Sequence, residues 1–299
     1  IMSHPCQSIS VALACHPHYV HLITKSRMMV VNMALAVLLV AAVEFGEAHA
    51  SSTSLQPLSP RTERIARETG LSLRDYYERY ADKQIPVIIQ DLEHLYADMT
   101  RANILNVCGE EMVTTEGLNK EAKTWAHLVE TGVTQLKDIM NDKTGANFPG
   151  SVGVFDWPLI DCPGFLEAYY TVPKYFAQDY LQRVDPQIHV SFRDSWPSLF
   201  VGFNGTYGGC HKDLCGTSFW QYVIEGEKEW HIAEDAAHGD FYSEPDARLH
   251  HWHDIVGPGE LLIIPGDCWH QVRNKGTTLS LAGNFVGRGQ LGTFERAIN

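Results

Sequence analysis

The chain has 299 residues, enough for one large domain or two small ones with a sizeable core. Apolar residues make up 44% of it and charged residues 20%, which is typical of globular proteins and excludes extended disorder and a coiled coil. The formal net charge is −13, which argues against a nucleic-acid or anionic-membrane partner, since both need clustered positive charge. A basic peptide would be attracted, although many acidic enzymes are simply kept soluble by such a charge.

The N-terminal part has the pattern of a targeting segment. Residues 28–43 form an apolar run, MMVVNMALAVLLVAAV, which follows Lys25 and Arg27 and precedes a small-x-small site ending at Ala50. These are the three parts of a secretory signal peptide, and the run is shorter than the roughly 20 residues that a spanning helix needs. We therefore expect residues 1–50 to be a signal peptide cleaved after Ala50, with a signal anchor as the alternative.

This interpretation places the mature chain in the secretory pathway, in the lumen of the endoplasmic reticulum or outside the cell, with no stable membrane span after cleavage. Initiation at Met28 or Met29 would give a signal of more usual length, so residues 1–27 need not be translated. Five cysteines follow residue 50, and an odd number in an oxidising compartment leaves at least one thiol free or paired with another chain.

The first part of the mature chain is predicted to be mostly helical. Residues 51–64 are interpreted as a linker because they begin with a serine- and proline-rich stretch, and residues 65–150 as a helical N-terminal region. Ser72 and Thr100 have the position of helix N-caps, and the second helix is expected to end at Gly109. Further expected elements are strands at residues 86–90 and 152–156 and a helix over residues 173–184.

From about Ser198 the pattern changes to short apolar runs, each separated from the next by a glycine or proline turn. Turns are expected at NGTYGG, EGE, GPG, PGD and NKG. Many short strands at this spacing indicate an antiparallel sandwich or barrel rather than βαβ units. We therefore predict a mainly β fold with a helical N-terminal cover, in which residues 151–287 form the barrel and residues 288–299 a C-terminal tail.

The barrel region carries a candidate metal site. His211 and Asp213 are two residues apart, so in a strand both would face the same side. A second H-x-D triplet begins at His238, in a loop-like stretch, whereas the first lies in the barrel pattern together with His270, which stands at a strand end after a Pro-Gly turn. Two histidines and one carboxylate form the facial triad of non-haem Fe(II) oxygenases, which leaves positions open for a 2-oxo acid and O₂. A structural zinc site would be closed by a fourth ligand.

Lys228, in the stretch EGEKEW, is the third component of this site. A lysine inside a barrel is costly unless it is paired, so an anionic partner is expected there. The ammonium group could reach the far carboxylate of a dicarboxylic co-substrate. The alternative is that Lys228 is an ordinary surface residue of a hairpin.

Two stretches carry the motifs of a known family: SLFVGFNGTYGGCHKDLCGTSFWQYVIEGEKEWHI and PGELLIIPGDCWHQVRNKGTTLSLAGNF. Their succession of H-x-D, G-T-S-x-W, G-x-K-x-W, P-G-x-x-W-H and N-F resembles the JmjC (Jumonji-C) domain. Within that family the chain looks most like the small JmjC-only protein hydroxylases, such as the phosphatidylserine-receptor-like lysyl hydroxylases. The resemblance covers about residues 65–287, nearly the whole mature chain.

The resemblance implies a double-stranded β-helix, the barrel also called a cupin or jelly roll. It also implies an oxygenase that uses Fe(II), O₂ and 2-oxoglutarate, with succinate and CO₂ as co-products. His211, Asp213 and His270 would bind Fe(II), and Lys228 would form a salt bridge with the C5 carboxylate of 2-oxoglutarate. The substrate would be a protein or peptide, hydroxylated on a side chain such as Lys or Arg, and hydroxylation beside an N-methyl nitrogen would demethylate it.

The co-substrate site departs from the family pattern. Three hydroxyl donors of the nearest relatives are missing, since Gly153 replaces a tyrosine and Gly208 and Ala282 replace threonines. Each could contribute about 1 kcal/mol as a net hydrogen bond.

Other side chains could replace these donors. Gln221 stands where the relatives have an asparagine that helps to hold 2-oxoglutarate, and Thr206, Tyr207 and Asn284 are further candidates. Two functions therefore remain open. One is a protein hydroxylase of the secretory pathway, and the other is a non-catalytic luminal binding module that keeps the fold and a metal but has lost productive co-substrate binding.

A second histidine group lies in the stretch LHHWHD, at His250, His251 and His253. No carboxylate or cysteine spacing completes a metal site around it, so a polar loop is the favoured interpretation. Cys210, Cys215 and Cys268 lie within a few residues of the candidate iron ligands, and buried small apolar residues are favoured over a regulatory disulfide there.

Overall fold

The structure is a computed structural model that describes residues 62–185, 195–234, 241–242 and 251–298. The expected targeting segment, nearly all of the expected linker, His250 and the second H-x-D triplet lie outside the described residues. Within the described ranges no helix is long and apolar enough to cross a membrane.

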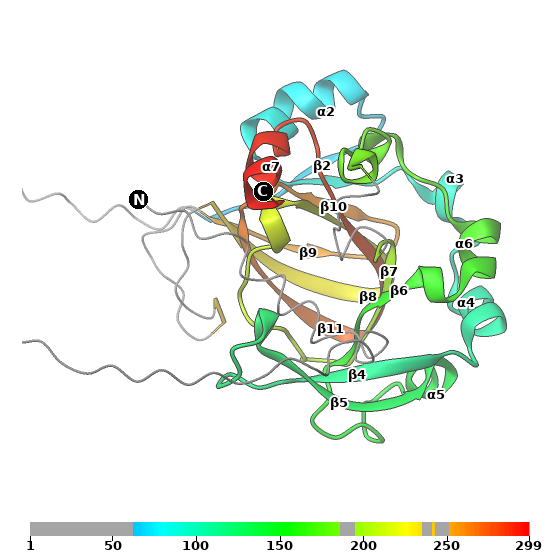
Figure 1. Ribbon diagram of the computed structural model, residues 1–299. Coiled ribbons are helices and arrows are strands. Elements are labelled where there is room, and N and C mark those ends of the chain that lie inside the picture. Colours follow the sequence, from blue (N-terminus) through cyan, green and yellow to red (C-terminus); the bar gives the residue numbers. More distant parts are fainter. Residues whose placement is uncertain (1–61, 186–194, 235–240, 243–250, 299) are drawn as a thin grey trace, which may run out of the picture.

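The described residues form one large, mostly antiparallel sheet of eleven strands, as the predicted mainly β fold requires (Figure 1). The strand order is β2-β3-β10-β8-β11-β7-β6-β4-β5, and β9 lies between β8 and β1. This sheet curls into the double-stranded β-helix that the sequence predicts. The strands are β1 (Thr62–Glu63), β2 (Ala66–Glu68), β3 (Val87–Ile89), β4 (Met112–Leu118), β5 (Leu128–Gln135), β6 (Gly153–Pro158), β7 (Ser198–Gly202), β8 (Ser218–Ala233), β9 (His251–Val256), β10 (Leu261–Ile264) and β11 (Trp269–Phe285).

Two long strands, β8 and β11, form the centre of the barrel and pair along most of their length. The prediction of turns at EGE and NKG is wrong, because the continuous strands β8 and β11 run through these stretches. The pairing of the two strands shifts register between Lys275 and Leu279. Gly226 and Gly276 adopt φ values of 72° and 79°, as bulged strands allow for glycine. A Cβ atom at Gly226 would lie 2.4 Å from the carbonyl oxygen of Thr277, so the two strands can bend together only with glycine there.

β8 joins the two parts of the barrel wall. Its first part pairs with β10 and its last part with β9, while β11 lies along its other edge. Apolar side chains pack inside the barrel, and some of them line the same pocket as the polar residues described below. The buried apolar residues of this inner cluster include Phe200, Phe219, Val223, Trp230, Ile232, Leu262 and Ala282.

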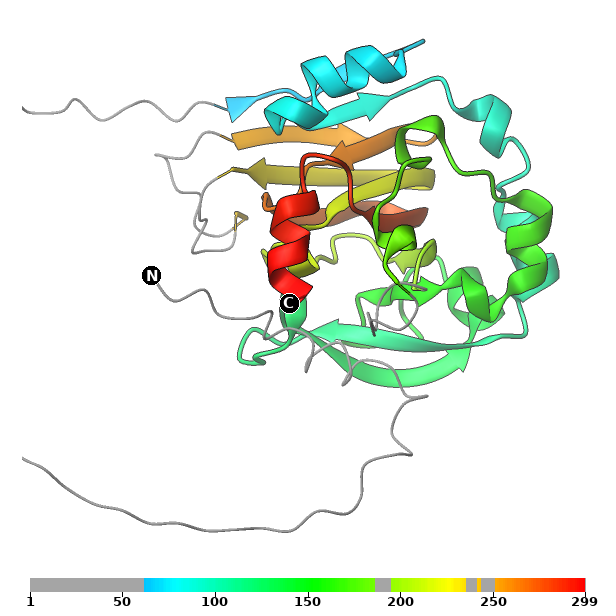
Figure 2. The same ribbon diagram turned by 45° about the horizontal axis from the view of Figure 1, so that its top comes forward.

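Helices cover the outside of the sheet (Figures 1 and 2). In both views α2 lies at one end of the sheet and the β4–β5 hairpin at the other, with α3, α4 and α6 along one side. The helices are α2 (Leu73–Arg79), α3 (Glu93–Tyr96), α4 (Arg101–Cys108), α5 (Leu136–Asn141), α6 (Pro163–Tyr169) and α7 (Leu291–Ile298). Single 3₁₀ turns are η2 (Ala81–Lys83), η3 (Trp125–His127), η4 (Leu159–Asp161), η5 (Lys174–Phe176), η6 (Leu181–Arg183) and η7 (Leu214–Gly216).

The predicted helix caps are confirmed. The Ser72 hydroxyl accepts a hydrogen bond from the Asp75 amide at 3.0 Å, and the Thr100 hydroxyl accepts one from the Asn103 amide at 3.2 Å. The second helix ends at Gly109, as expected. The strand expected at residues 86–90 is β3, which is fully buried, and the one expected at residues 152–156 is β6.

The N-terminal region also contains a hairpin, β4–β5, that the helical prediction for residues 65–150 omits. The inward positions of β4 are held by Val113, Thr115 and Gly117, which are buried. Only one of these three residues is a large apolar side chain. The alternation that marks a strand is therefore hidden in the sequence.

The helix expected over residues 173–184 is replaced by the two short turns η5 and η6. Between them the backbone bonds to the end of β11 instead of to itself, since the Tyr180 amide donates to the Val286 carbonyl at 2.9 Å. The Asp179 carboxylate accepts from the amides of Leu181, at 2.9 Å, and of Val286, at 2.8 Å. These tertiary hydrogen bonds use backbone amides that a continuous helix would need for its own hydrogen bonds.

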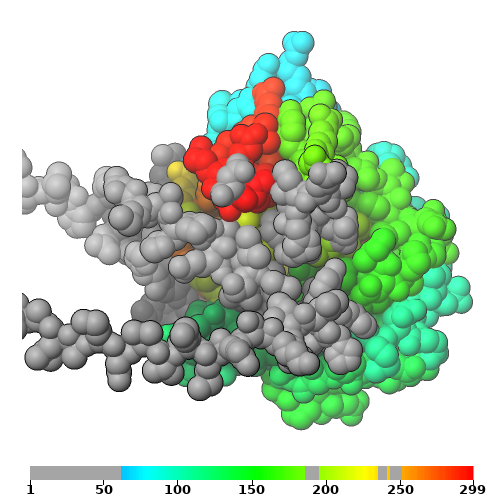
Figure 3. All heavy atoms as spheres, viewed as in Figure 1, coloured from blue at the N-terminus to red at the C-terminus, as the bar shows by residue number. Residues whose placement is uncertain are grey.

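The predicted C-terminal tail forms the helix α7, which lies at the surface in Figure 3. Its Phe294 is buried and packs with Leu181 and Cys215 in a small separate cluster. Cys268 is buried in the inner cluster, so Cys215 and Cys268 both occupy the apolar packing positions that were favoured for them.

A disulfide joins Cys108, at the end of α4, to Cys162, just before α6. The two cysteines are separated by 54 residues in sequence, and both are buried. The bond therefore closes a long loop across the helical side of the sheet. Such a loop lowers the entropy of the unfolded chain, by an amount that corresponds to about 4 kcal/mol of stability.

Replacing Cys108 and Cys162 together by serine should lower the free energy of unfolding by about 4 kcal/mol. Urea denaturation of the oxidised protein and the double variant measures this difference. Dithiothreitol should destabilise the wild type by a similar amount and leave the double variant unchanged. Equal stability of oxidised wild type and variant would show that the bond does not constrain the unfolded chain.

Candidate metal centre and co-substrate pocket

The two histidines of the predicted triad are neighbours across the barrel wall. His211 and His270 form an isolated antiparallel bridge, in which each amide donates to the other's carbonyl, at 3.1 Å and 2.9 Å. Their rings lie 4.4 Å apart at 66°. Pairing of the extended backbone thus brings together two histidines that are 59 residues apart in sequence.

Backbone carbonyls fix the orientation of both imidazoles. Nδ1 of His211 lies 2.8 Å from the carbonyl oxygen of Gly209, and Nδ1 of His270 lies 3.2 Å from that of Cys268. In each case Nδ1–H donates to the backbone and Nε2 keeps its lone pair. Metal-binding histidines in proteins are commonly held in this way by their second nitrogen.

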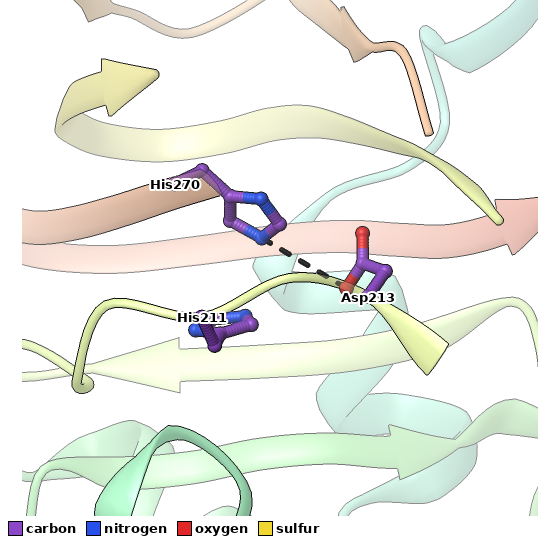
Figure 4. Close-up of side chains that lie close together, drawn as sticks. All are labelled: His211, Asp213 and His270. Carbon is purple, nitrogen blue, oxygen red and sulfur yellow. Dashed lines mark ion pairs between the residues drawn. The ribbon is translucent and has the colours of Figure 1, made fainter. Parts of the chain in front are cut away.

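Asp213 completes the group, two residues after His211 (Figure 4). One ligand atom from each of the three side chains lies within 4.8 Å of the others, and Oδ1 of Asp213 is 3.8 Å from Nε2 of His270. All three side chains are almost inaccessible to solvent. The structure thus brings together the three residues that the sequence pattern predicts as ligands.

The protonation of these groups suits a cation. Burial lowers the pKa of His211 to about 3 and that of His270 to about 4, so both rings are neutral at neutral pH. Burial raises the pKa of Asp213 to about 7, and the nearby His211 ring and the Asn284 amide partly offset this rise. Two neutral imidazoles and one carboxyl group are the donor set that divalent iron accepts, and a bound cation would favour the ionised carboxylate that burial alone penalises.

The three candidate ligands line a pocket that opens into the barrel. Of the residues predicted to contact a co-substrate, four line the same pocket: Tyr207, Gln221, Lys228 and Asn284. Trp125, from the turn between β4 and β5, was missed by the sequence interpretation. Its ring meets that of His211 edge-on at 4.3 Å, and its Nε1–H donates to the carbonyl of Lys212 at 3.2 Å.

Lys228 lies inside the barrel and is only 3% exposed. Its ammonium group donates to Oδ1 of Asn274 at 2.9 Å, and no carboxylate of the described residues forms an ion pair with it. Burial lowers the pKa of Lys228 to about 7. A buried ammonium group that lines a pocket without an acidic partner among the described residues is suited to bind an anion.

Asn274 was also missed, although it is the direct partner of Lys228 in the register of β11 and β8. Its side-chain amide donates to the Thr206 hydroxyl at 3.0 Å, and its oxygen also accepts from Thr278 at 2.9 Å. Thr206 itself donates to the Phe203 carbonyl at 2.7 Å and does not line the pocket. The expected role of Thr206 as a direct co-substrate contact is therefore not supported, because its hydroxyl is used to position Asn274.

Several polar atoms around the pocket lack a partner within the described residues. Oε1 of Gln221, Nε1 of Trp230 and the hydroxyl of Ser280 are buried without any hydrogen bond. Leaving such groups unsatisfied costs about 1–3 kcal/mol each. Gln221 and Trp230 line the pocket, so a polar ligand there would remove this penalty.

The three departures from the family pattern have different structural causes. At Gly153 a Cβ atom would lie 1.8 Å from the carbonyl oxygen of Val201, so the close approach of β6 and β7 requires glycine. At Gly208 a Cβ atom would meet nothing nearer than Ala126, at 3.7 Å, so a side chain would fit. Ala282 is fully buried in the inner cluster.

The prediction of a polar loop around His251 and His253 is wrong, because both residues lie in strand β9. His253 faces His231 of β8, and these two histidines form with Glu229 a second group of side chains that could hold a metal ion. The sequence pattern did not reveal this group, since its members meet only through the pairing of β8 with β9.

The fold and the first site together define a class: a jelly-roll barrel with a His-Asp-His group on its inner wall and a buried lysine in the same pocket. No protein-family model matches the chain. Comparison with curated proteins finds JmjC-domain relatives, which confirms the resemblance stated above.

Three of these relatives show the extent of the similarity. The human 2-oxoglutarate and iron-dependent oxygenase JMJD4 is 28% identical over 46% of this chain and 37% of its own length. The arginine-specific demethylase JMJ22 of Arabidopsis thaliana is 20% identical over 81% of this chain and 50% of its own length. The bifunctional arginine demethylase and lysyl-hydroxylase psr-1 of Caenorhabditis elegans is 26% identical over 39% of this chain and 35% of its own length. The chain thus spans half or less of these relatives.

Proposed function

We propose that the chain is an Fe(II)- and 2-oxoglutarate-dependent oxygenase that hydroxylates a protein side chain. The observation that carries the proposal is the buried group of His211, Asp213 and His270, in which both imidazoles are oriented by backbone carbonyls. Relatives named as iron- and 2-oxoglutarate-dependent oxygenases and demethylases support it.

Each residue then has a defined task. His211 and His270 would hold iron through Nε2 and Asp213 through its carboxylate, which leaves three positions of an octahedron for co-substrate and O₂. Lys228 would bind the far carboxylate of 2-oxoglutarate, with Asn274 fixing the direction of its ammonium group. Iron and 2-oxoglutarate would supply oxidative decarboxylation, so that 2-oxoglutarate, O₂ and a substrate C–H yield succinate, CO₂ and a C–OH group.

The substrate of the proposed reaction is a Lys- or Arg-containing protein or peptide. The names of JMJ22 and psr-1 refer to arginine demethylation and, for psr-1, to lysyl hydroxylation. The net charge of −13 would favour the approach of a basic segment. Asp156 lines the same pocket as the candidate iron ligands, and its carboxylate, which accepts a hydrogen bond from Nε1 of Trp196 at 3.2 Å, adds an acidic group there.

We also propose that the protein acts in the secretory pathway. The expected signal peptide and the disulfide between Cys108 and Cys162 support an oxidising compartment. The competing function, a binding module without catalysis, is favoured by one observation. No hydroxyl group stands at Gly153, Gly208 or Ala282 to assist Lys228.

The decisive experiment is thermal denaturation of residues 51–299 with Mn²⁺, and with Mn²⁺ plus N-oxalylglycine, an unreactive mimic of 2-oxoglutarate. A ligand at 100 times its dissociation constant stabilises the folded state by about 2.7 kcal/mol, which corresponds to a midpoint shift of about 5–10 °C for a domain of this size. We expect the mimic to act only when metal is present. Succinate should form when Fe(II), 2-oxoglutarate and O₂ replace Mn²⁺ and the mimic. Stabilisation by metal alone, with no response to the mimic and no succinate, would favour the binding module.

A further inference from the structure

A second group of metal-binding side chains lies on the outer face of the barrel wall. Glu229 and His231 are two residues apart on β8, and His253 on β9 is the direct cross-strand partner of His231. Side chains alternate between the two faces of a strand. Glu229 and His231 therefore point away from the pocket that Lys228 and Trp230 line.

The geometry brings three donors to one place. One ligand atom of each residue lies within 4.8 Å of the others, and Nε2 of His253 is 3.1 Å from Oε1 of Glu229. The rings of His231 and His253 are stacked, 4.3 Å apart at 15°. Zinc bonds of about 2.0–2.2 Å to nitrogen and oxygen need donors about 3.3 Å apart and lone pairs that converge, so one of the two stacked imidazoles must turn about its side-chain torsions for the group to close around an ion.

The environment favours neutral imidazole. Burial lowers the pKa of His231 to about 4, and its Nδ1 is buried without a hydrogen-bond partner among the described residues. Phe241 stacks on the ring at 5.5 Å, and Tyr242 meets it edge-on at 5.0 Å. Arg273, the cross-strand partner of Glu229, opposes a cation, but its guanidinium lies on the Tyr242 ring, at 3.7 Å.

We propose that Glu229, His231 and His253 bind a divalent cation of the zinc type on the outside of the barrel. A packing role alone leaves Nδ1 of His231 buried without a hydrogen-bond partner among the described residues, whereas metal binding through this nitrogen would use it as a ligand. Two imidazoles and one carboxylate are a common zinc ligand set, and the fourth position is open to water. The site is separate from the candidate iron centre, and bound metal would link β8 to β9.

For the test, a chelator first removes all metal from the protein, which is then equilibrated with Zn²⁺ by dialysis. Elemental analysis counts the bound zinc in the wild type, in three variants and in one control variant. We expect His253→Ala and Glu229→Gln each to remove one equivalent of Zn²⁺ from the total. His211→Ala should remove a different equivalent, the one bound in the barrel, and the exposed His94→Ala control should remove none. Circular dichroism melting establishes that each variant is folded, and Glu229→Gln changes the carboxylate with little change in shape.

Zinc stoichiometry that is the same in wild type, His253→Ala and Glu229→Gln would overturn the proposal. The two sites are tested independently. If the barrel does not bind metal, His211→Ala leaves the count unchanged while His253→Ala still lowers it. Binding of Co²⁺ provides a second readout, because a four-coordinate site gives a visible absorption band that should vanish in His253→Ala and persist in His211→Ala.

Discussion

Replacing Lys228 by methionine should make the ligand-free protein more stable and at the same time abolish its response to N-oxalylglycine. The ammonium group is buried beside the neutral amide of Asn274, so the folded state holds a positive charge with no ion-pair partner among the described residues. Methionine fills a similar volume without that charge. Replacing buried charges by apolar residues of similar size is often stabilising.

The pH dependence of wild-type stability follows from the direction in which folding shifts the pKa of Lys228. Burial lowers the pKa of Lys228 to about 7, whereas an exposed lysine in the unfolded chain titrates near its ordinary value. Between these two values the unfolded chain binds more protons than the folded one, so wild-type stability rises with pH in that range. Near pH 7 almost the whole penalty is present, and Lys228→Met should gain up to about 4 kcal/mol there.

The measurement is urea denaturation of wild type and Lys228→Met at pH 7 and pH 9, with and without Mn²⁺ and N-oxalylglycine. The stability difference should be larger at pH 7 than at pH 9, and only the wild type should be stabilised by the mimic. Lys275→Met changes an exposed lysine on the neighbouring strand β11 and should alter neither property. A Lys228→Met protein that is less stable than the wild type at both pH values would mean that the ammonium group supports the barrel.

The candidate iron ligands could be predicted from sequence because each lies in a short local motif. His211 and Asp213 are two residues apart, and His270 follows a Pro-Gly turn. The spacing could not show that His211 and His270 bridge directly, or that carbonyls of Gly209 and Cys268 orient the rings. Those features depend on cross-strand register, which no local motif specifies.

Dependence on cross-strand register also explains which residues of the site the sequence interpretation missed. Asn274 supports Lys228 only because the two residues are paired in register, 46 residues apart in sequence. Trp125 reaches His211 from a turn in a hairpin whose strands were themselves not recognised. The EGE stretch looked like a turn because Gly226 marks one in most contexts, yet it marks a bulge in a continuous strand.

Replacing Asp213 by asparagine should remove the response to metal without loss of folding. Asparagine keeps the size of the side chain but never carries the negative charge that offsets the charge of a divalent ion. Changes to groups that only support metal ligands already lower affinity or activity about 10- to 100-fold, so loss of the ligand charge itself should cost at least 100-fold. Succinate formation should fall by at least the same factor.

The ligand-free variant should be as stable as the wild type or more so. Burial raises the pKa of Asp213 to about 7, which means that the empty folded site penalises the ionised carboxylate. Asparagine removes that penalty, and the exposed Asp98→Asn control should change neither stability nor metal binding. Titration of Mn²⁺, followed by thermal denaturation, separates the two effects. If Asp213→Asn kept wild-type Mn²⁺ affinity, the carboxylate would not be a ligand and the barrel centre would consist of two histidines alone.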